Sequence, residues 1–387
     1  MRTREKFEQL EIENLAPYAM KSRDSRGRKF KEADHPVRTA YQRDRDRIVH
    51  SQAFRKLEYK TQVFVIFEGD YYRTRLTHTI EVAQIGRTIG RSLQLNEDLI
   101  EAIALAHDLG HPPFGHAGEE ALTAIMKQAN YKGFNHNMRS FQIVTQFEKR
   151  YPDFDGLNLT REVLVGILKH QSSYDEAGFL TEYRDEGPTL EAQVVDFADS
   201  LAYLNHDVDD GLKSGCITID DLKESELWCK ALERLGNNVH FHDLEMLRYQ
   251  VVKALIDMQV QDLLWNTSQR LPGLNFSSAE DVKVYRQPVI SFSNQMKALR
   301  DELQSLLFNK LYNHYRVLRM TNKAKRIIKA LFDVYLKEPN QLPPEVYPRT
   351  GCSEEEEYLI ICNYIAGMTD RSAMDEHKRF FDAYTKV

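Results

Sequence analysis

The pair His107-Asp108 is the part of the sequence best suited to chemistry, because an imidazole and a carboxylate can both bind one cation. The pair stands in AIALAHDLGHPPFGHAGEEAL; His78 precedes it in RTRLTHTIEVAQ, and the Asp-rich segment VVDFADSLAYLNHDVDD follows it. Two His and two Asp together suit a divalent first-row metal or Mg²⁺ and leave coordination positions for water and substrate. These residues therefore predict a catalytic metal site.

The Asp-rich segment offers several candidates for the fourth ligand: Asp196, Asp199, Asp207, Asp209 and Asp210. Asp199, Tyr203 and Asp207 fall at i, i+4 and i+8 and therefore share one stripe of a helix. The rest of that helix is largely apolar, so a carboxylate in the stripe would be buried and would need a partner such as a metal ion. Asp199 is the predicted ligand.

Helices are expected to position these side chains. Apolar residues recur at helical spacing from near Thr77. Asn96 is expected to cap the next helix, which ends at the His-Asp pair because Gly110 and a Pro-Pro step follow. The pair would then lead into a loop that carries His111 and His116.

Helical patterns also cover most of the remaining chain. They lie in MRSFQIVTQFEKR, TREVLVGILKHQ, EAQVVDFADSLAYLNHDVDDGL, from about Asp243 to Leu336, and in EEEYLIICNYIAGMTDRSAMDEHKRFFDAY. Gly (18) and Pro (12) are sparse among the 387 residues, which favours helices. We expect one compact all-α unit with an N-terminal arm and helix in residues 1–60, a metal-binding core in 61–215 and a C-terminal helical region in 216–387.

Charge and composition limit the partners and the location. A formal net charge of -6 gives no overall attraction to nucleic acid or to an anionic membrane. The four cysteines lack the spacing of a zinc site or a disulfide framework, which fits a reducing compartment. No apolar stretch approaches the roughly 18 residues of a membrane span. The expected location is the cytoplasm, with no membrane partner.

Five segments together resemble the HD-domain dNTP triphosphohydrolases, the dGTPase-like family, and in particular its shorter members. The segments are RTAYQRDRDRIVHSQAFRKLEYKTQVF, RTRLTHT, AHDLGHPPFGHAGE, ADSLAYLNHDVDD and YIAGMTDRSA, so the resemblance covers most of the chain. A lone HD pair marks only the superfamily, whereas KTQVF, RTRLTH and HPPFGH together mark this family. The resemblance implies an HD-domain helical bundle with a C-terminal helical extension.

The resemblance also implies a metal centre and a reaction. By their positions in the motifs, His78, His107, Asp108 and Asp199 match the family's metal ligands. Mg²⁺, Mn²⁺ or another transition metal is the expected ion, with Mg²⁺ or Mn²⁺ favoured, and such an ion would polarise the α-phosphate and lower the pKa of a bound water. In the family, water attacks the α-phosphorus of a dNTP, and the products are the deoxynucleoside and tripolyphosphate.

Further residues match the family's catalytic and phosphate-binding positions. His116 matches the catalytic histidine, and Glu119 would orient it; alternatively, Glu119 merely begins a helix. His111 and His136 match positions that contact phosphates in relatives. Arg75 is the cation that best suits the phosphate oxygens, because a guanidinium can bind them with two hydrogen bonds.

Other matches concern the sugar and a second binding site. Gln62 and Asp207 match residues that bind the 3′-hydroxyl, and Tyr203 matches the ring that packs against deoxyribose, although Tyr203 could also be plain core. The run YQRDRDR fits either surface ion pairs or a contact with phosphate or another subunit. The resemblance further implies a homo-oligomer, a tetramer or hexamer, and an effector dNTP or single-stranded DNA that the sequence does not locate.

The sequence departs from the family pattern at three positions. Asn135 stands where an acid is usual, Arg139 where glutamine is common, and Ser372 where the family has tyrosine. These changes spare the metal ligands but leave the base preference among dNTPs open. Two rival functions also stay open: another HD phosphohydrolase, such as a 5′-nucleotidase or cyclic-nucleotide phosphodiesterase, and a dNTP-sensing or nucleic-acid-binding protein without turnover.

Overall fold

The protein folds into α-helices, as the sequence predicted. The computed structural model describes residues 1–62, 73–170, 181–183, 186–236, 243–285, 287–347 and 352–386. This part of the chain contains seventeen α-helices and no β-sheet. The helices are α1 (Arg4–Asn14), α2 (Ala40–Val49), α3 (Gln52–Lys56), α4 (Arg75–Ser92), α5 (Glu97–Ala106), α6 (Gly115–Gln128), α7 (His136–Gln142), α8 (Arg161–Leu168), α9 (Leu190–Ser214), α10 (Ile219–Leu222), α11 (Glu226–Leu235), α12 (Leu244–Leu274), α13 (Ala279–Tyr285), α14 (Asn294–Leu307), α15 (Tyr315–Lys337), α16 (Glu354–Ala366) and α17 (Asp370–Phe381).

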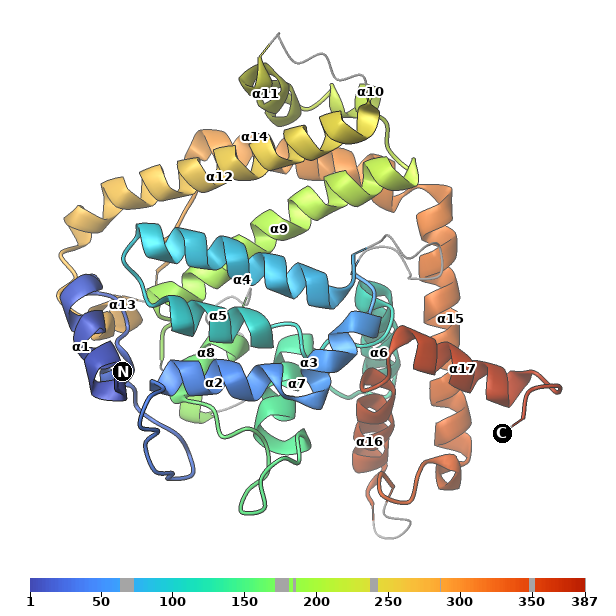
Figure 1. The fold of residues 1–387 in the computed structure, drawn as a ribbon. Coiled ribbons are helices and arrows are strands. Elements are labelled where there is room, and N and C mark those ends of the chain that lie inside the picture. The colour runs from blue at the N-terminus through green and yellow to red at the C-terminus, as the bar shows by residue number, and fades with distance from the viewer. Residues whose placement is uncertain are drawn as a thin grey trace.

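The helices that carry the predicted ligands pack directly against one another. Figure 1 shows α12, α9, α4, α5 and α2 one below another, and each of these helices contacts the next. The α5 helix is strongly apolar and also contacts α8 and α9. Because α4, α5 and α9 pack against one another, polar side chains on the surfaces where they face each other lie close together.

The end of α5 has the structure that the sequence predicted. Asn96 caps the helix by accepting a hydrogen bond from the backbone N–H of Leu99 at 3.2 Å, and the helix ends at Ala106, just before the His-Asp pair. In the loop that follows, a Cβ on Gly110 would lie 2.1 Å from the carbonyl oxygen of His136. The absence of a side chain at Gly110 therefore lets this loop press against the start of α7.

The C-terminal helices form a second hydrophobic core with α6. This core joins Phe114 and Leu122 to Ile328 and Phe332 of α15 and to residues of α16 and α17. Figure 1 shows α15 and α16, in orange to red, beside α6, and α17 packs against α15. The larger core draws on residues from Ala16 to Val317. The division of the chain near residues 60 and 215 remains a proposal.

A buried carboxylate at the start of α17 ties the C-terminal helices to two segments that carry predicted site residues. Asp370 accepts hydrogen bonds from the backbone N–H of Thr61 at 3.0 Å and of Phe114 at 2.8 Å. Thr61 precedes Gln62, and Phe114 shortly precedes His116. The C-terminal region therefore helps to position both segments.

The three departures from the family pattern lie outside the predicted metal ligands. Asn135 caps α7 by accepting from the backbone N–H of Met138 at 2.8 Å, as an acid could also do. Arg139 is buried and donates to the carbonyl oxygen of Asn363 at 2.7 Å, which joins α7 to α16. Ser372 is exposed on α17.

Two other predictions concern the surface. The Arg-rich run lies on α2 and forms ion pairs, for example from Arg45 to Asp98 at 3.1 Å and from Arg47 to Glu32 at 2.8 Å. These contacts are ion pairs, but they do not form a solvated surface, because the side chains of Arg47 and Glu32 are only 8% and 20% exposed. Within the described ranges, no helix combines the length and apolar content that a bilayer crossing needs.

Candidate active site

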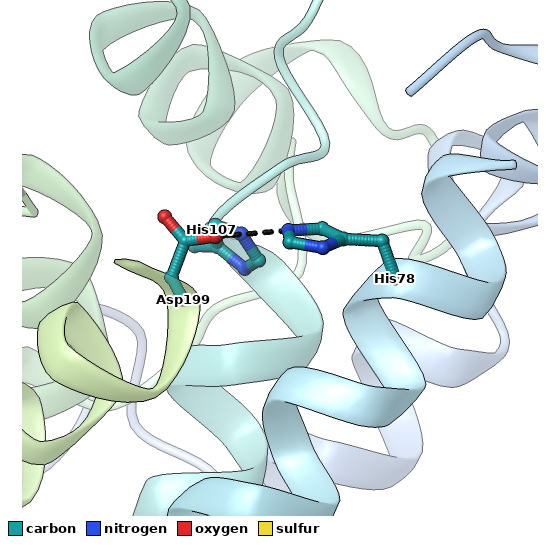
Figure 2. Close-up of side chains that lie close together, drawn as sticks. All are labelled: His78, His107 and Asp199. Atoms are coloured by element: carbon teal, nitrogen blue, oxygen red, sulfur yellow. Dashed lines mark hydrogen bonds and ion pairs between the residues drawn. The ribbon is translucent and has the colours of Figure 1, made fainter. Parts of the chain in front are cut away.

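Four buried side chains from three helical segments meet where a metal site was predicted. His78 comes from α4, His107 and Asp108 follow α5, and Asp199 comes from α9; Figure 2 shows His78, His107 and Asp199 close together. Nε2 of His78 lies 2.9 Å from Oδ1 of Asp199 and 4.0 Å from Oδ2 of Asp108. Nε2 of His107 lies 3.4 Å from Oδ1 of Asp108 and 3.8 Å from Oδ1 of Asp199.

The hydrogen bonding of His107 shows that the cluster fits a cation. Its Nδ1 lies 2.6 Å from the carbonyl oxygen of Ala104, which only accepts, so Nδ1 carries the hydrogen. Burial lowers the pKa of His107, so the ring is neutral and Nε2 presents a lone pair. That nitrogen is buried without a hydrogen-bond partner and faces carboxylate oxygens. A metal ion would satisfy the lone pair and the carboxylates together.

Asp108 is held ionised by its neighbours. Arg75 donates to Oδ2 at 2.9 Å, and Nδ1 of His111 lies 2.9 Å from Oδ1. Burial alone would raise the pKa of Asp108, but Arg75, His107 and His111 hold it well below its usual range. The Nε and Nη2 atoms of Arg75 are buried without a hydrogen-bond partner, and the Arg75 side chain lines the adjoining cavity.

His170 contacts the cluster, although it was not predicted from the sequence. Its Nε2 lies 3.2 Å from Oδ2 of Asp199, and its Nδ1 lies 2.6 Å from Oδ1 of Asp196. Burial opposes the charge, yet these two carboxylates raise the pKa of His170 to about 10. A sequence signal existed, because His170 follows the apolar helix α8 much as His107 follows α5.

Glu119 lies closer to His136 than to its predicted partner His116, so the pairing of Glu119 with His116 stays a prediction. The backbone N–H and Nδ1 of His136 donate to Oε1 of Glu119 at 3.1 and 2.9 Å. Nδ1 of His116 lies 4.0 Å from Oε2, and this side chain is 54% exposed. Burial raises the pKa of Glu119, but contacts with His136 and His111 lower it to about 2. The two donors of His136 therefore hold an ionised carboxylate.

Two adjoining cavities open beside the cluster. The first, about 350 Å³, is lined by Gln62, Arg75, His78, Asp108, His111, His116, His136, His170, Asp199, Ser200, Tyr203 and Gln304. The second, about 500 Å³, shares Gln62, His116, Ser200, Tyr203 and Gln304 with the first. Its other walls include the apolar residues Phe114, Leu307, Phe308, Val317 and Met320. The two cavities together can hold a ligand with a highly charged end and an aromatic end.

A chain of hydroxyl groups lies in the wall of the second cavity. The hydroxyl of Tyr312 donates to Oδ2 of Asp207 at 2.5 Å and lies 2.5 Å from the hydroxyl of Tyr203. Tyr312 was not predicted from the sequence; it ends a π-helical turn, Phe308–Tyr312, that continues α14. The predicted sugar-binding residues Gln62, Tyr203 and Asp207 all line this cavity.

Asp207 is expected to make the stability of the protein depend on pH. Burial first, and then the charge of Asp210, raise the pKa of Asp207 to about 8, despite the hydrogen bond from Tyr312. The folded state therefore holds a proton that the unfolded chain has lost above about pH 4. The contribution of Asp207 to the free energy of unfolding consequently falls as pH rises from about 4 to about 8.

Asp207→Asn should remove this contribution, because the amide has no proton to lose. We expect the stability of the variant relative to the wild type to increase from pH 5 to pH 8, as measured by thermal unfolding without metal or nucleotide. Parallel changes in the melting temperature of both proteins across this range would contradict the prediction.

The sequence also matches known families and proteins. Residues 75–204 match the HD domain, and residues 290–379 match the phosphohydrolase-associated domain. The first range contains all four side chains of the cluster, and HD domains bind divalent metal ions. The second range contains Tyr312 and much of the wall of the larger cavity.

Similarity to individual proteins extends over nearly the whole chain. A protein of Geobacter sulfurreducens is 50% identical over 380 residues, which are 98% of this chain and 98% of that protein. Relatives from Geobacter metallireducens and Ralstonia nicotianae are each 48% identical, over 97% and 95% of this chain and the same shares of their own lengths. All three are named deoxyguanosinetriphosphate triphosphohydrolase-like protein. This chain therefore belongs to the family of HD-domain, deoxyguanosinetriphosphate triphosphohydrolase-like proteins.

Proposed function

We propose that the protein hydrolyses dNTPs, dGTP among them, to the deoxynucleoside and tripolyphosphate by attack of water on the α-phosphorus. The main support is the buried His78, His107, Asp108 and Asp199 cluster, which lies beside a polar cavity that adjoins a more apolar one. The names of the relatives point to deoxyguanosine triphosphate as a substrate class. A nucleotide has a charged phosphate end and a more apolar nucleoside end, and the two adjoining cavities match these two ends.

The polar cavity is suited to the triphosphate. A divalent metal held by His78, His107, Asp108 and Asp199, Mg²⁺ or Mn²⁺, would polarise the phosphate and lower the pKa of a bound water. Arg75 offers its two unpartnered nitrogens to phosphate oxygens. The stacked rings of His111 and His136, 3.9 Å apart, add further nitrogen atoms to this wall.

The second cavity is suited to the deoxynucleoside. Gln62 and Asp207 bind the 3′-hydroxyl in this proposal, and the ring of Tyr203 packs against the sugar at the junction of the two cavities. The hydroxyl of Tyr312 is hydrogen-bonded to Asp207 and to Tyr203, each at 2.5 Å, and so fixes both side chains. In this proposal the ring of Tyr203 leaves no room for a 2′-hydroxyl. A site that fills this space favours dNTPs over NTPs.

His116 is the proposed general acid for the leaving deoxynucleoside. Its side chain lines both cavities, at the junction between the charged end and the nucleoside end of the ligand. A protonated imidazole there can donate to the departing 5′-oxygen. Because Glu119 is held by His136, the carboxylate supports the phosphate-binding wall in this proposal rather than the acid itself.

Product analysis tests the function directly. We expect the full chain with Mg²⁺ or Mn²⁺ to release deoxynucleoside and tripolyphosphate in equal amounts from at least one dNTP, with little turnover of the matching NTP. Chelation with EDTA should abolish the reaction, and added metal should restore it. Each dNTP should be assayed alone and in mixtures, with resolution of nucleoside, monophosphate, diphosphate and tripolyphosphate.

Other products would favour another function. Orthophosphate from a nucleoside monophosphate, or opening of a cyclic diester, would indicate a 5′-nucleotidase or a cyclic-nucleotide phosphodiesterase. Binding of dNTPs or DNA without turnover would indicate a sensing or binding protein. The homo-oligomer, tetramer or hexamer, the dNTP or single-stranded DNA effector and the cytoplasmic location remain predictions.

A further inference from the structure

The two imidazoles of the metal cluster have different partners at Nδ1, the ring nitrogen other than the Nε2 that faces the cluster. Nδ1 of His107 lies 2.6 Å from the carbonyl oxygen of Ala104. Nδ1 of His78 instead lies 3.2 Å from Nδ1 of His206, a buried residue of α9. The aspartates of this helical segment were singled out in the sequence, but the proposed reaction gives His206 no role.

Glu81 sets the direction of the hydrogen bonds through His206. Nε2 of His206 contacts Oε2 of Glu81, and an ionised carboxylate only accepts, so Nε2 carries the hydrogen. A neutral His206 then has a lone pair on Nδ1, which accepts from Nδ1–H of His78. Nε2 of His78 consequently presents its own lone pair to the cluster, 2.9 Å from Oδ1 of Asp199.

Glu81 is itself held by a cation. Nε of Arg73 lies 3.3 Å from Oε1 of Glu81, and Nη1 of Arg73 donates to Asp209 at 2.6 Å and to Asp210 at 3.1 Å. These two aspartates follow His206 closely on α9. The α9 helix therefore supplies His206, which contacts His78. It also supplies the two aspartates that bind Arg73 beside Glu81.

We propose that Glu81 and His206 are positioning residues that hold His78 in the tautomer and orientation with which it binds a divalent metal. Metal-binding histidines depend on such partners, and their loss commonly weakens metal affinity by about 10- to 100-fold. The inference rests on the metal centre of the proposed function. It does not depend on the identity of the nucleotide substrate.

Two substitutions of His206 separate a specific role from a general effect on packing. His206→Leu removes the acceptor for Nδ1–H of His78, whereas His206→Asn places a side-chain oxygen where Nδ1 stood. The control is His50→Leu, because His50 is exposed at the end of α2, outside both cavities. Each full-length protein is stripped of metal and titrated with Mn²⁺ in the absence of nucleotide, with free Mn²⁺ followed by electron paramagnetic resonance.

We expect His206→Leu to weaken Mn²⁺ binding by about 10- to 100-fold and His206→Asn to restore most of the affinity. Glu81→Leu should weaken Mn²⁺ binding as well. Because Glu81 acts through His206, adding Glu81→Leu to His206→Leu should cause little further loss. His50→Leu should bind Mn²⁺ as the wild type does.

Several results would overturn the inference. One is wild-type Mn²⁺ affinity in His206→Leu; another is an equal loss in the Leu and Asn variants that follows their metal-free melting temperatures. A wild-type chain that binds no Mn²⁺ would overturn the metal centre and this inference together. A chain that binds Mn²⁺ with the expected variant pattern but releases no tripolyphosphate would support the inference and overturn the proposed substrate.

Discussion

Asp199→Ala is expected to lower kcat/KM by at least about a thousandfold and to remove tight Mn²⁺ binding. Oδ1 of Asp199 lies 2.9 Å from Nε2 of His78 and 3.8 Å from Nε2 of His107, so the substitution removes one side of the cluster. A metal ion supplies several kcal/mol of transition-state stabilisation, and about 1.36 kcal/mol corresponds to each tenfold in rate. Steady-state kinetics and Mn²⁺ titration measure the two effects.

Asp196→Ala is the matched control for the choice of ligand. Asp196 lies one turn earlier on the same helix, contacts Nδ1 of His170 at 2.6 Å and is 26% exposed at its side chain. The sequence left Asp196 as an alternative fourth ligand. In the structure it contacts Nδ1 of His170, whereas the other ring nitrogen, Nε2, faces Asp199. We expect this variant to keep Mn²⁺ binding and to lose far less activity than Asp199→Ala.

The comparison is informative only if both variants remain folded. Melting temperatures of the metal-free proteins should show that the lost activity of Asp199→Ala does not come from unfolding. Normal turnover in Asp199→Ala, or equal losses of Mn²⁺ affinity in the two variants, would refute Asp199 as the ligand.

The helical class and the end of α5 could be predicted because their signals are local, whereas the stretch from about Asp243 to Leu336, expected to be helical, is divided into α12, α13, α14 and α15. Asn96 caps α5 and a loop with Gly110 and two prolines follows it, so the position of His107 at the helix end needed no tertiary information. The choice of Asp199 also rested on one helix, because Asp199, Tyr203 and Asp207 share an i, i+4, i+8 stripe of α9. Burial alone would not have selected it, because residues 204–211 of α9 are buried on every side of the helix.

The contacts that were not predicted join segments far apart in the chain. Tyr312 reaches Asp207 from beyond α14, and His170 reaches Asp199 from the end of α8. No spacing of residues in the sequence predicts either contact, because each contact depends on how separate helices pack. The contact of Glu119 with His136 likewise depends on how separate helices pack, so the spacing of residues in the sequence could not predict it.

The spacing of His116 and Glu119 favours contact on one helix, yet α7 brings two donors of His136 closer to the carboxylate. His206 was overlooked for a related reason. Its neighbours in the sequence are acids that suggested metal ligands, while its own partners, His78 and Glu81, both lie on α4.

His116→Ala is expected to lower kcat by about 100- to 10,000-fold while leaving Mn²⁺ affinity unchanged, because general acid catalysis contributes effects of this size. His116 lines both cavities, but its ring does not belong to the buried His-Asp cluster. KM should change much less than kcat. His377→Ala on α17, outside both cavities, is the control for replacing an imidazole.

The pH dependence of kcat provides the second measurement. Partial removal from water and the charge of Arg75 lower the pKa of His116 below that of a free imidazole. His116 therefore loses its proton as pH rises through this lowered pKa. The wild-type kcat should therefore fall with rising pH on this limb, and His116→Ala should lack the fall. An unchanged pH profile in the variant, or a kcat close to the wild type, would show that another group protonates the leaving 5′-oxygen.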